Sequence, residues 1–159
     1  MAFGSWNGTE TDDNLDAYTK ALVLSKYTME TAKPKQKKKN GKVYNSNKHI
    51  PMRYAELGKE LTQLSVDIGS LILEANTAWY VGGNLNIADR RDNYIERIKL
   101  EKQAIAKTYR MEHIVRVLHE HKPFADSTFN YWIKLICETR KETIAWRDSE
   151  IRQLKGCRL

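Results

Sequence analysis

The stretch LGKELTQLSVDIGSLILEANTAW, residues 57–79, decides the fold class of this chain. Its apolar side chains recur three and four positions apart, which places them on one face of an α-helix. Pro51 can lie in the first turn of this helix, where its missing amide costs little, and Gly82-Gly83 is expected to end it. The stripe consists of Leu57, Leu61, Leu64, Ile68, Leu71, Ile72, Ala75, Ala78 and Trp79.

The same spacing predicts a helix on the N-terminal side, from Asp12 or Asp13 to about Thr31. Pro34 is expected to end it, because proline lacks the amide donor and biases the residue before it away from the helical region. We expect this helix to face the core with a stripe made of Leu15, Tyr18, Leu22, Ser25 and Met29.

Two further helices are predicted on the C-terminal side. The third begins near Ala88 or Asp89 and is closed by Pro123, and the fourth begins at Asp126 or Ser127. The stripe of the third is Tyr94, Ile98, Ile105, Tyr109, Val115 and Leu118. The stripe of the fourth is Phe129, Trp132, Ile133, Ile136, Thr139, Thr143, Trp146 and Leu154.

No strand-like alternation competes with these patterns, and 159 residues with 41% apolar side chains indicate one domain. The short links between the second, third and fourth helices favour an all-α, antiparallel up-down four-helix bundle. We expect a flexible N-terminal segment at 1–11, the bundle at 12–155 with a mobile basic loop at 32–50, and a tail at 156–159.

The net charge of +7 is concentrated in one place. Residues 31–55 hold eight basic side chains and no acid, whereas the rest of the chain has 19 basic and 20 acidic side chains. Lysine-rich runs bind phosphates through counterion release, so this segment predicts a nucleic-acid contact, although it could also serve solubility alone. Tyr44 and His49 could stack on unpaired bases. The basic residues are Lys33, Lys35, Lys37, Lys38, Lys39, Lys42, Lys48 and Arg53.

A second basic surface is expected where arginines cluster on the last two helices. Arg90, Arg91 and Arg97 lie at the start of the third helix. On the fourth helix, Arg140 and Arg147 are seven residues apart and therefore share a face. Arg90, Arg91, Arg140 and Arg147 are the candidates for contact with RNA or a protein partner.

Catalytic, metal and cofactor sites are not expected. His113, His119 and His121 lack the three- or four-residue spacing that helical neighbours need, and no glycine-rich phosphate loop occurs. Cys137 is expected to be a buried apolar residue. The absence of a long apolar run and of an export signal predicts a cytoplasmic protein that is neither an enzyme nor membrane-bound.

Two stretches carry a family resemblance. IPMRYAELGKELTQLSVDIGSLILEAN (50–76) and YWIKLICETRKETIAWRDS (131–149) resemble the second and last helices of the accessory variability determinant (Avd) proteins of diversity-generating retroelements. The resemblance extends over roughly residues 14–152. Arg53, Tyr54, Asn76 and Arg147 match motif positions, and the lysine-rich insertion between the first two helices departs from the family pattern.

The resemblance implies a function and an assembly. Avd-type proteins are non-catalytic homopentamers that associate with reverse transcriptase and its template RNA during error-prone cDNA synthesis. RNA or an RNA/DNA hybrid, a reverse transcriptase and further copies of this chain are therefore the expected partners. The alternative is a helix-bundle protein–protein adaptor that does not bind nucleic acid.

Overall fold

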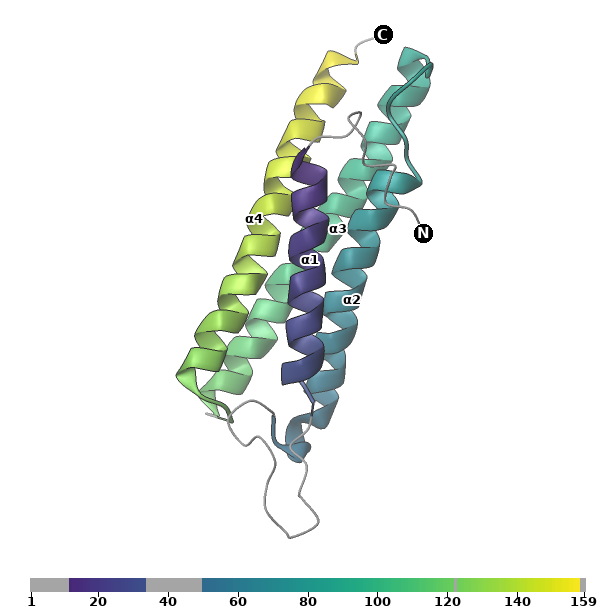
Figure 1. Cartoon of the computed structure of the whole chain (residues 1–159). Coiled ribbons are helices and arrows are strands. Elements are labelled where there is room, and N and C mark those ends of the chain that lie inside the picture. Colours follow the sequence, from purple (N-terminus) through teal and green to yellow (C-terminus); the bar gives the residue numbers. More distant parts are fainter. Residues whose placement is uncertain (1–11, 34–49, 122, 158–159) are drawn as a thin grey trace.

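The computed structural model describes residues 12–33, 50–121 and 123–157. The described parts are helical and contain no strand, which confirms the all-α class (Figure 1). The order is α1 (Asp12–Thr31), the short 3-10 helix η2 (Met52–Tyr54), α2 (Ala55–Thr77), α3 (Ile87–Glu120) and α4 (Asp126–Gly156).

The four long helices lie side by side as a bundle (Figure 1). α1 packs against α2 and α4, and α3 packs against the same two helices. The chain passes from α1 to α2 and from α3 to α4 at one end of the bundle, and from α2 to α3 at the other end. Residues far apart in the sequence therefore meet at each end.

The core is built around two tryptophans of α4. Trp132 and Trp146 are 0% and 1% exposed, which confirms their predicted place in the core, whereas Trp79 is half-buried. The indole Nε1 of Trp132 donates a hydrogen bond to Oγ1 of Thr28 in α1 at 3.0 Å. Satisfying this buried donor lets the largest side chain lie in the core without an unpaired polar group.

The predicted buried face of α1 is wrong at Leu22 and Met29, although Tyr18 does pack against the core. Leu22 and Met29 are 50% and 49% exposed, and the buried face consists of Ala17, Ala21, Leu24, Thr28 and Thr31. Both stripes have helical spacing, but the buried one has smaller side chains, so the helix axes can approach closely. A Cβ built on Gly69 of α2 would lie 3.9 Å from Cβ of Ala21, which shows how near the two helices come.

Three predicted boundaries also change. α2 ends at Thr77, before Gly82-Gly83, and side chains of α3 bind carbonyl groups of the link that follows. Arg97 donates to the carbonyl of Trp79, Asn93 to that of Tyr80, and Arg90 to those of Val81 and Leu85. The predicted basic loop at 32–50 is too wide, since its first and last residues, Ala32 and Ile50, are buried in the core. The fourth helix, predicted to end at 155, continues to Gly156. The predicted terminal segment 1–11 lies outside the described residues.

Gly58 allows α2 to pack closely against the residues that follow α1. A Cβ at this position would lie 2.5 Å from the carbonyl oxygen of Ala32 and 2.6 Å from Cδ1 of Ile50. We expect Gly58→Ala to lower the free energy of unfolding by about 1–3 kcal/mol, because it overpacks a site closed partly by backbone. Urea denaturation measures the change. Gly69→Ala is the matched control: it has room, and removing a helical glycine should stabilise α2 by about 0.5–1 kcal/mol. Equal effects of the two variants would contradict this account.

Candidate nucleic-acid interface and a buried ionic cluster

Within the acid-free segment, Lys33 and Ile50, the described residues on either side of 34–49, lie next to each other. Lys35, Lys37, Lys38, Lys39, Lys42 and Lys48, together with Tyr44 and His49, lie outside the described residues. The amide of Ile50 donates to the carbonyl of Lys33 at 3.3 Å, so the two ends of the segment are held together. Lys33 and Arg53 are exposed beside this junction. The predicted cationic residues are thus attached where α1 ends and α2 begins (Figure 1).

Arg53 belongs to a group of planar side chains at this end of the bundle. Its guanidinium carbon lies 4.9 Å from the centre of the Tyr54 ring. The ring of His121, at the end of α3, lies 5.6 Å from that of Tyr54 with an angle of 43° between the planes. Tyr54 is half-buried against the core, whereas Arg53 and His121 are exposed. We call Arg53, Tyr54 and His121 the end platform.

His119 is already engaged by its neighbours. Its ring is stacked on Phe129 at 3.8 Å with 11° between the planes, and its Nε2 lies 2.8 Å from Oδ1 of Asp126. The guanidinium of Arg116 lies 5.9 Å from the centre of the same Phe129 ring. In the described ranges, no group of three His, Cys, Asp or Glu side chains is placed to hold a metal ion.

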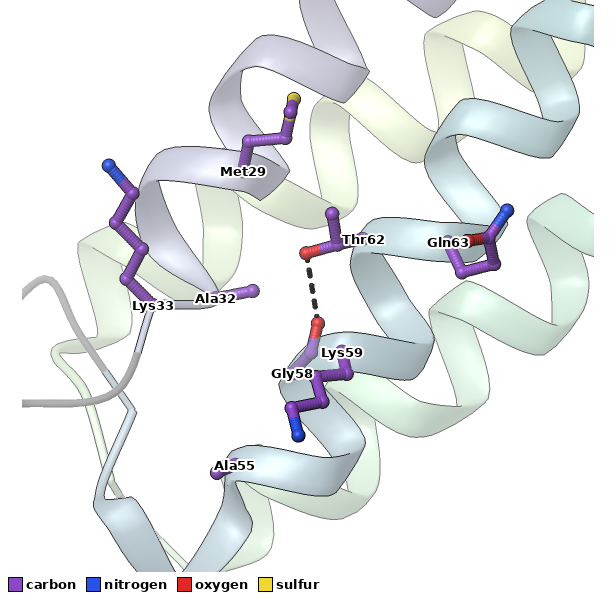
Figure 2. A pocket seen from close by; sticks show the side chains of 8 residues that line it. All are labelled: Met29, Ala32, Lys33, Ala55, Gly58, Lys59, Thr62 and Gln63. Carbon is purple, nitrogen blue, oxygen red and sulfur yellow. Dashed lines mark hydrogen bonds between the residues drawn. The ribbon is translucent and has the colours of Figure 1, made fainter.

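A groove of about 500 Å³ lies between the end of α1 and the start of α2 (Figure 2). Met29, Ala32 and Ala55 give it apolar walls, and it is also lined by Lys33, which follows the end of α1, and by Lys59 of α2. Oγ1 of Thr62 is turned to the carbonyl of Gly58, to which it donates at 3.0 Å. The remaining lining residue is Gln63, whose amide nitrogen donates to Asp67 at 2.8 Å.

Only some arginines of the predicted second basic surface have an exposed charge. The Arg90 side chain donates to the Val81 and Leu85 carbonyls at 3.1 Å each, so it fastens the link between α2 and α3. Arg91 is exposed and lies 4.0 Å from Asp92. Of the two, Arg91 has its charge at the surface.

The two arginines of α4 also differ. Arg140 is 12% exposed, covers the ring of Tyr109 at 3.7 Å, and donates to Thr108 and Glu112 of α3 at 2.9 Å each. Arg147 is 27% exposed and donates to Asp148 at 3.1 Å. Arg140 therefore joins α3 to α4, and Tyr109, predicted to face the core, is 54% exposed beneath it.

Arg97, predicted to lie on the basic surface, is instead buried between α3 and α4. Its side chain is 2% exposed, and its Nε lies 2.5 Å from Oε1 of Glu150, which is 6% exposed. A second donor, Nη1, binds the carbonyl of Trp79 at 3.2 Å, and the guanidinium lies 5.5 Å from the Trp146 ring. The expectation was wrong because charge in a helical sequence does not reveal which face is turned inward.

Glu101 lies next to this ion pair and is 0% exposed. Neither of its carboxylate oxygens has a hydrogen-bond partner among the described residues. Burial, and after it the charge of Glu150, raise the pKa of Glu101 to about 8, against the opposing effects of Arg97 and Arg147. Burial also raises the pKa of Glu150, against the opposing effect of Arg97. One arginine therefore faces two buried carboxyl groups.

Interruptions in two apolar stripes of the sequence indicate this buried ionic cluster. The apolar stripe of α3 is interrupted between Ile98 and Ile105, where Glu101 lies, and that of α4 between Trp146 and Leu154, where Glu150 lies. A carboxylate in such a gap needs a buried cation, and Arg97 is four residues from Glu101. Pairing these two gaps across the bundle requires knowledge of which helices are neighbours.

Cys137 corrects a further prediction, because it is exposed rather than buried. Its sulfur lies 3.8 Å from Oε1 of Glu112 and 4.0 Å from Arg140. Leu135 and Ile136 take the core positions of this turn.

Comparisons of the chain with protein-family models, with curated proteins and with solved structures find no match. Within the ranges that the structure describes, no helix is long and apolar enough to span a membrane.

Proposed function

We propose that this chain is a cytoplasmic, non-catalytic accessory protein of a diversity-generating retroelement. In this role it binds the reverse transcriptase and template RNA, or an RNA/DNA hybrid, and supports error-prone cDNA synthesis. The observation that carries the proposal is the acid-free cationic segment fixed to one end of a helical bundle, with Lys33 and Arg53 exposed at its base. The resemblance to Avd-type helices supplies the polymerase and the retroelement.

We infer that the bundle is of the antiparallel up-down type. Contacts between α3 and α4 support this direction. Arg97, early in α3, contacts Glu150, late in α4. Glu112, late in α3, contacts Arg140, which comes before Glu150 in α4. α1 and α4 behave alike, since Lys20 lies 3.5 Å from Glu138 while Thr28 binds Trp132. Residue numbers that rise on one helix as they fall on its neighbour are those of antiparallel helices.

We also propose that the chain assembles into a homo-oligomer, with five copies by the resemblance. The supporting observation is a set of exposed apolar side chains on α1 and α2, namely Leu22, Met29 and Val66 at 50%, 49% and 41% exposure. Such side chains are commonly covered when they lie at a subunit interface. The same set also favours the alternative function, a protein–protein adaptor, which would co-purify with its partner after nuclease treatment.

The nucleic-acid part of the proposal is tested by salt dependence. Replacing Lys35, Lys37, Lys38, Lys39 and Lys42 by Gln should weaken RNA binding and lower the slope of log K against log salt by about 3, since each phosphate contact with a single strand contributes about 0.7. Filter binding at a series of salt concentrations measures the slope. The matched control replaces five exposed lysines of the helices by Gln: Lys99, Lys102, Lys134, Lys141 and Lys155. An unchanged slope in the first variant would contradict the role of the segment.

A further inference from the structure

We propose that the end platform binds unpaired bases of single-stranded nucleic acid by stacking, with Arg53 and His121 as the residues in contact. This inference rests on the proposed function and adds a second mode of recognition to it. The lysine-rich segment would hold phosphates, whereas the end platform would hold the bases themselves.

The geometry of the end platform suits this task. Tyr54 packs against the core, and its amide donates to the carbonyl of Pro51 at 2.9 Å. The amide of His121 donates to the carbonyl of Leu118 at 3.0 Å, so the last turn of α3 holds the backbone of His121. Arg53 and His121 each lie against Tyr54 and are exposed. A base can therefore stack on a planar group whose backbone is already in place, which reduces the entropy lost on binding.

The charges at this end also favour an anionic strand. Arg53 has no ion pair with any residue that the structure describes, and its contact there is with the Tyr54 ring. The nearby acids Glu56 and Asp126 are occupied by Lys59 at 3.1 Å and His119 at 2.8 Å. Glu120, next to His121, is the remaining exposed acid of this turn. The planar cation Arg53 can thus stack on a base and attract the adjacent phosphate.

The neighbouring aromatic pair of α3 and α4 is not an equivalent site. His119 and Phe129 already stack on each other at 3.8 Å, and Asp126 holds the imidazole. Within the end platform the ring planes of Tyr54 and His121 are tilted by 43°, so these two rings are not stacked face to face. Stacking on exposed planar groups requires unpaired bases, since paired bases are stacked inside their own helix. The structure therefore favours a single strand over a duplex.

The test compares two single strands that carry equal charge. The full chain is titrated with an oligouridine of about ten nucleotides and with an abasic strand of the same length. Arg53→Lys keeps the charge but removes the planar guanidinium, and His121→Ala removes the imidazole. Each variant should weaken oligouridine binding about five-fold or more, leave abasic binding unchanged, and keep the salt slope of the unmodified chain. Arg152→Lys and His113→Ala, on exposed helical positions away from this end, are the matched controls.

The possible failures of this test are distinguishable. Variants that bind oligouridine as the unmodified chain does would overturn the end platform and leave the proposed function standing. An equal loss on the abasic strand, or on a duplex of the same length, would show a charge effect and would overturn stacking. If the unmodified chain binds neither strand, both the end platform and the nucleic-acid function are wrong.

Discussion

Replacing Arg97 by methionine should lower the free energy of unfolding by about 3–5 kcal/mol, because it leaves buried carboxyl groups without their cation. Methionine keeps most of the volume of the arginine stem against Trp146. The variant loses the 2.5 Å contact with Glu150 and the donor to the Trp79 carbonyl. Urea denaturation measures the change, and Arg91→Met, at an exposed arginine of the same helix, is the control.

Replacing the whole cluster should reverse most of this loss. In the triple variant Arg97→Met, Glu101→Leu and Glu150→Leu, no buried charge remains, and apolar side chains of similar volume take its place. Buried ion pairs replaced in this way are often neutral or stabilising by about 1–4 kcal/mol. A single Arg97→Met variant as stable as the unmodified chain would show that the cluster is not a buried ion pair in solution.

The second large effect is a loss of stability as pH rises from about 5 to about 8. In the folded chain burial raises the pKa of Glu101 from 4.5 to about 8, whereas the unfolded chain has the ordinary value. Between these two values the folded state holds a proton that the unfolded state has released, so stability falls by about 1.4 kcal/mol per pH unit. The whole window amounts to the order of 4 kcal/mol. Glu150, whose pKa is also raised by burial, changes stability in the same direction.

Glu101→Gln isolates the contribution of this carboxyl group. The variant should match the unmodified chain near pH 5 and exceed it in stability at pH 8 and above, because glutamine stays neutral throughout. Denaturation at a series of pH values gives the two curves. Glu120→Gln, at an exposed position of α3, should leave the curve of the unmodified chain in place. A flat or rising stability between pH 5 and pH 8 in the unmodified chain would contradict a buried neutral Glu101.

Much of the fold was predictable because helix periodicity and helix ends are local properties. The helix starting at Asp12 and ending at Thr31, and the helix starting at Asp126, are found at the predicted residues. Trp132 and Trp146 lie in the core as their spacing indicated. These features depend on neighbouring residues of one segment, which a single sequence displays directly.

The candidate site was less predictable, because it depends on residues that are distant in the sequence. The local sign of Arg97, a glutamate four residues later, does not give its partner: Arg97 is buried with Glu150, whereas Arg91 is exposed six residues earlier. Likewise, Tyr54 and His121 meet because the start of α2 and the end of α3 share one end of the bundle. Pairings of this kind require the relative placement of the helices, and that is a tertiary property.

The sequence by itself determined that this chain is helical, where most helices begin and end, and that its excess positive charge lies in one acid-free segment. Only the tertiary structure decided which face of α1 is buried, because two stripes of equal period compete and the closer packing of Ala17, Ala21 and Leu24 prevails over the larger Leu22 and Met29. It also decided that Arg97 pairs with Glu150, with Glu101 buried nearby, because a buried charge finds its partner across helices, where sequence separation carries no information.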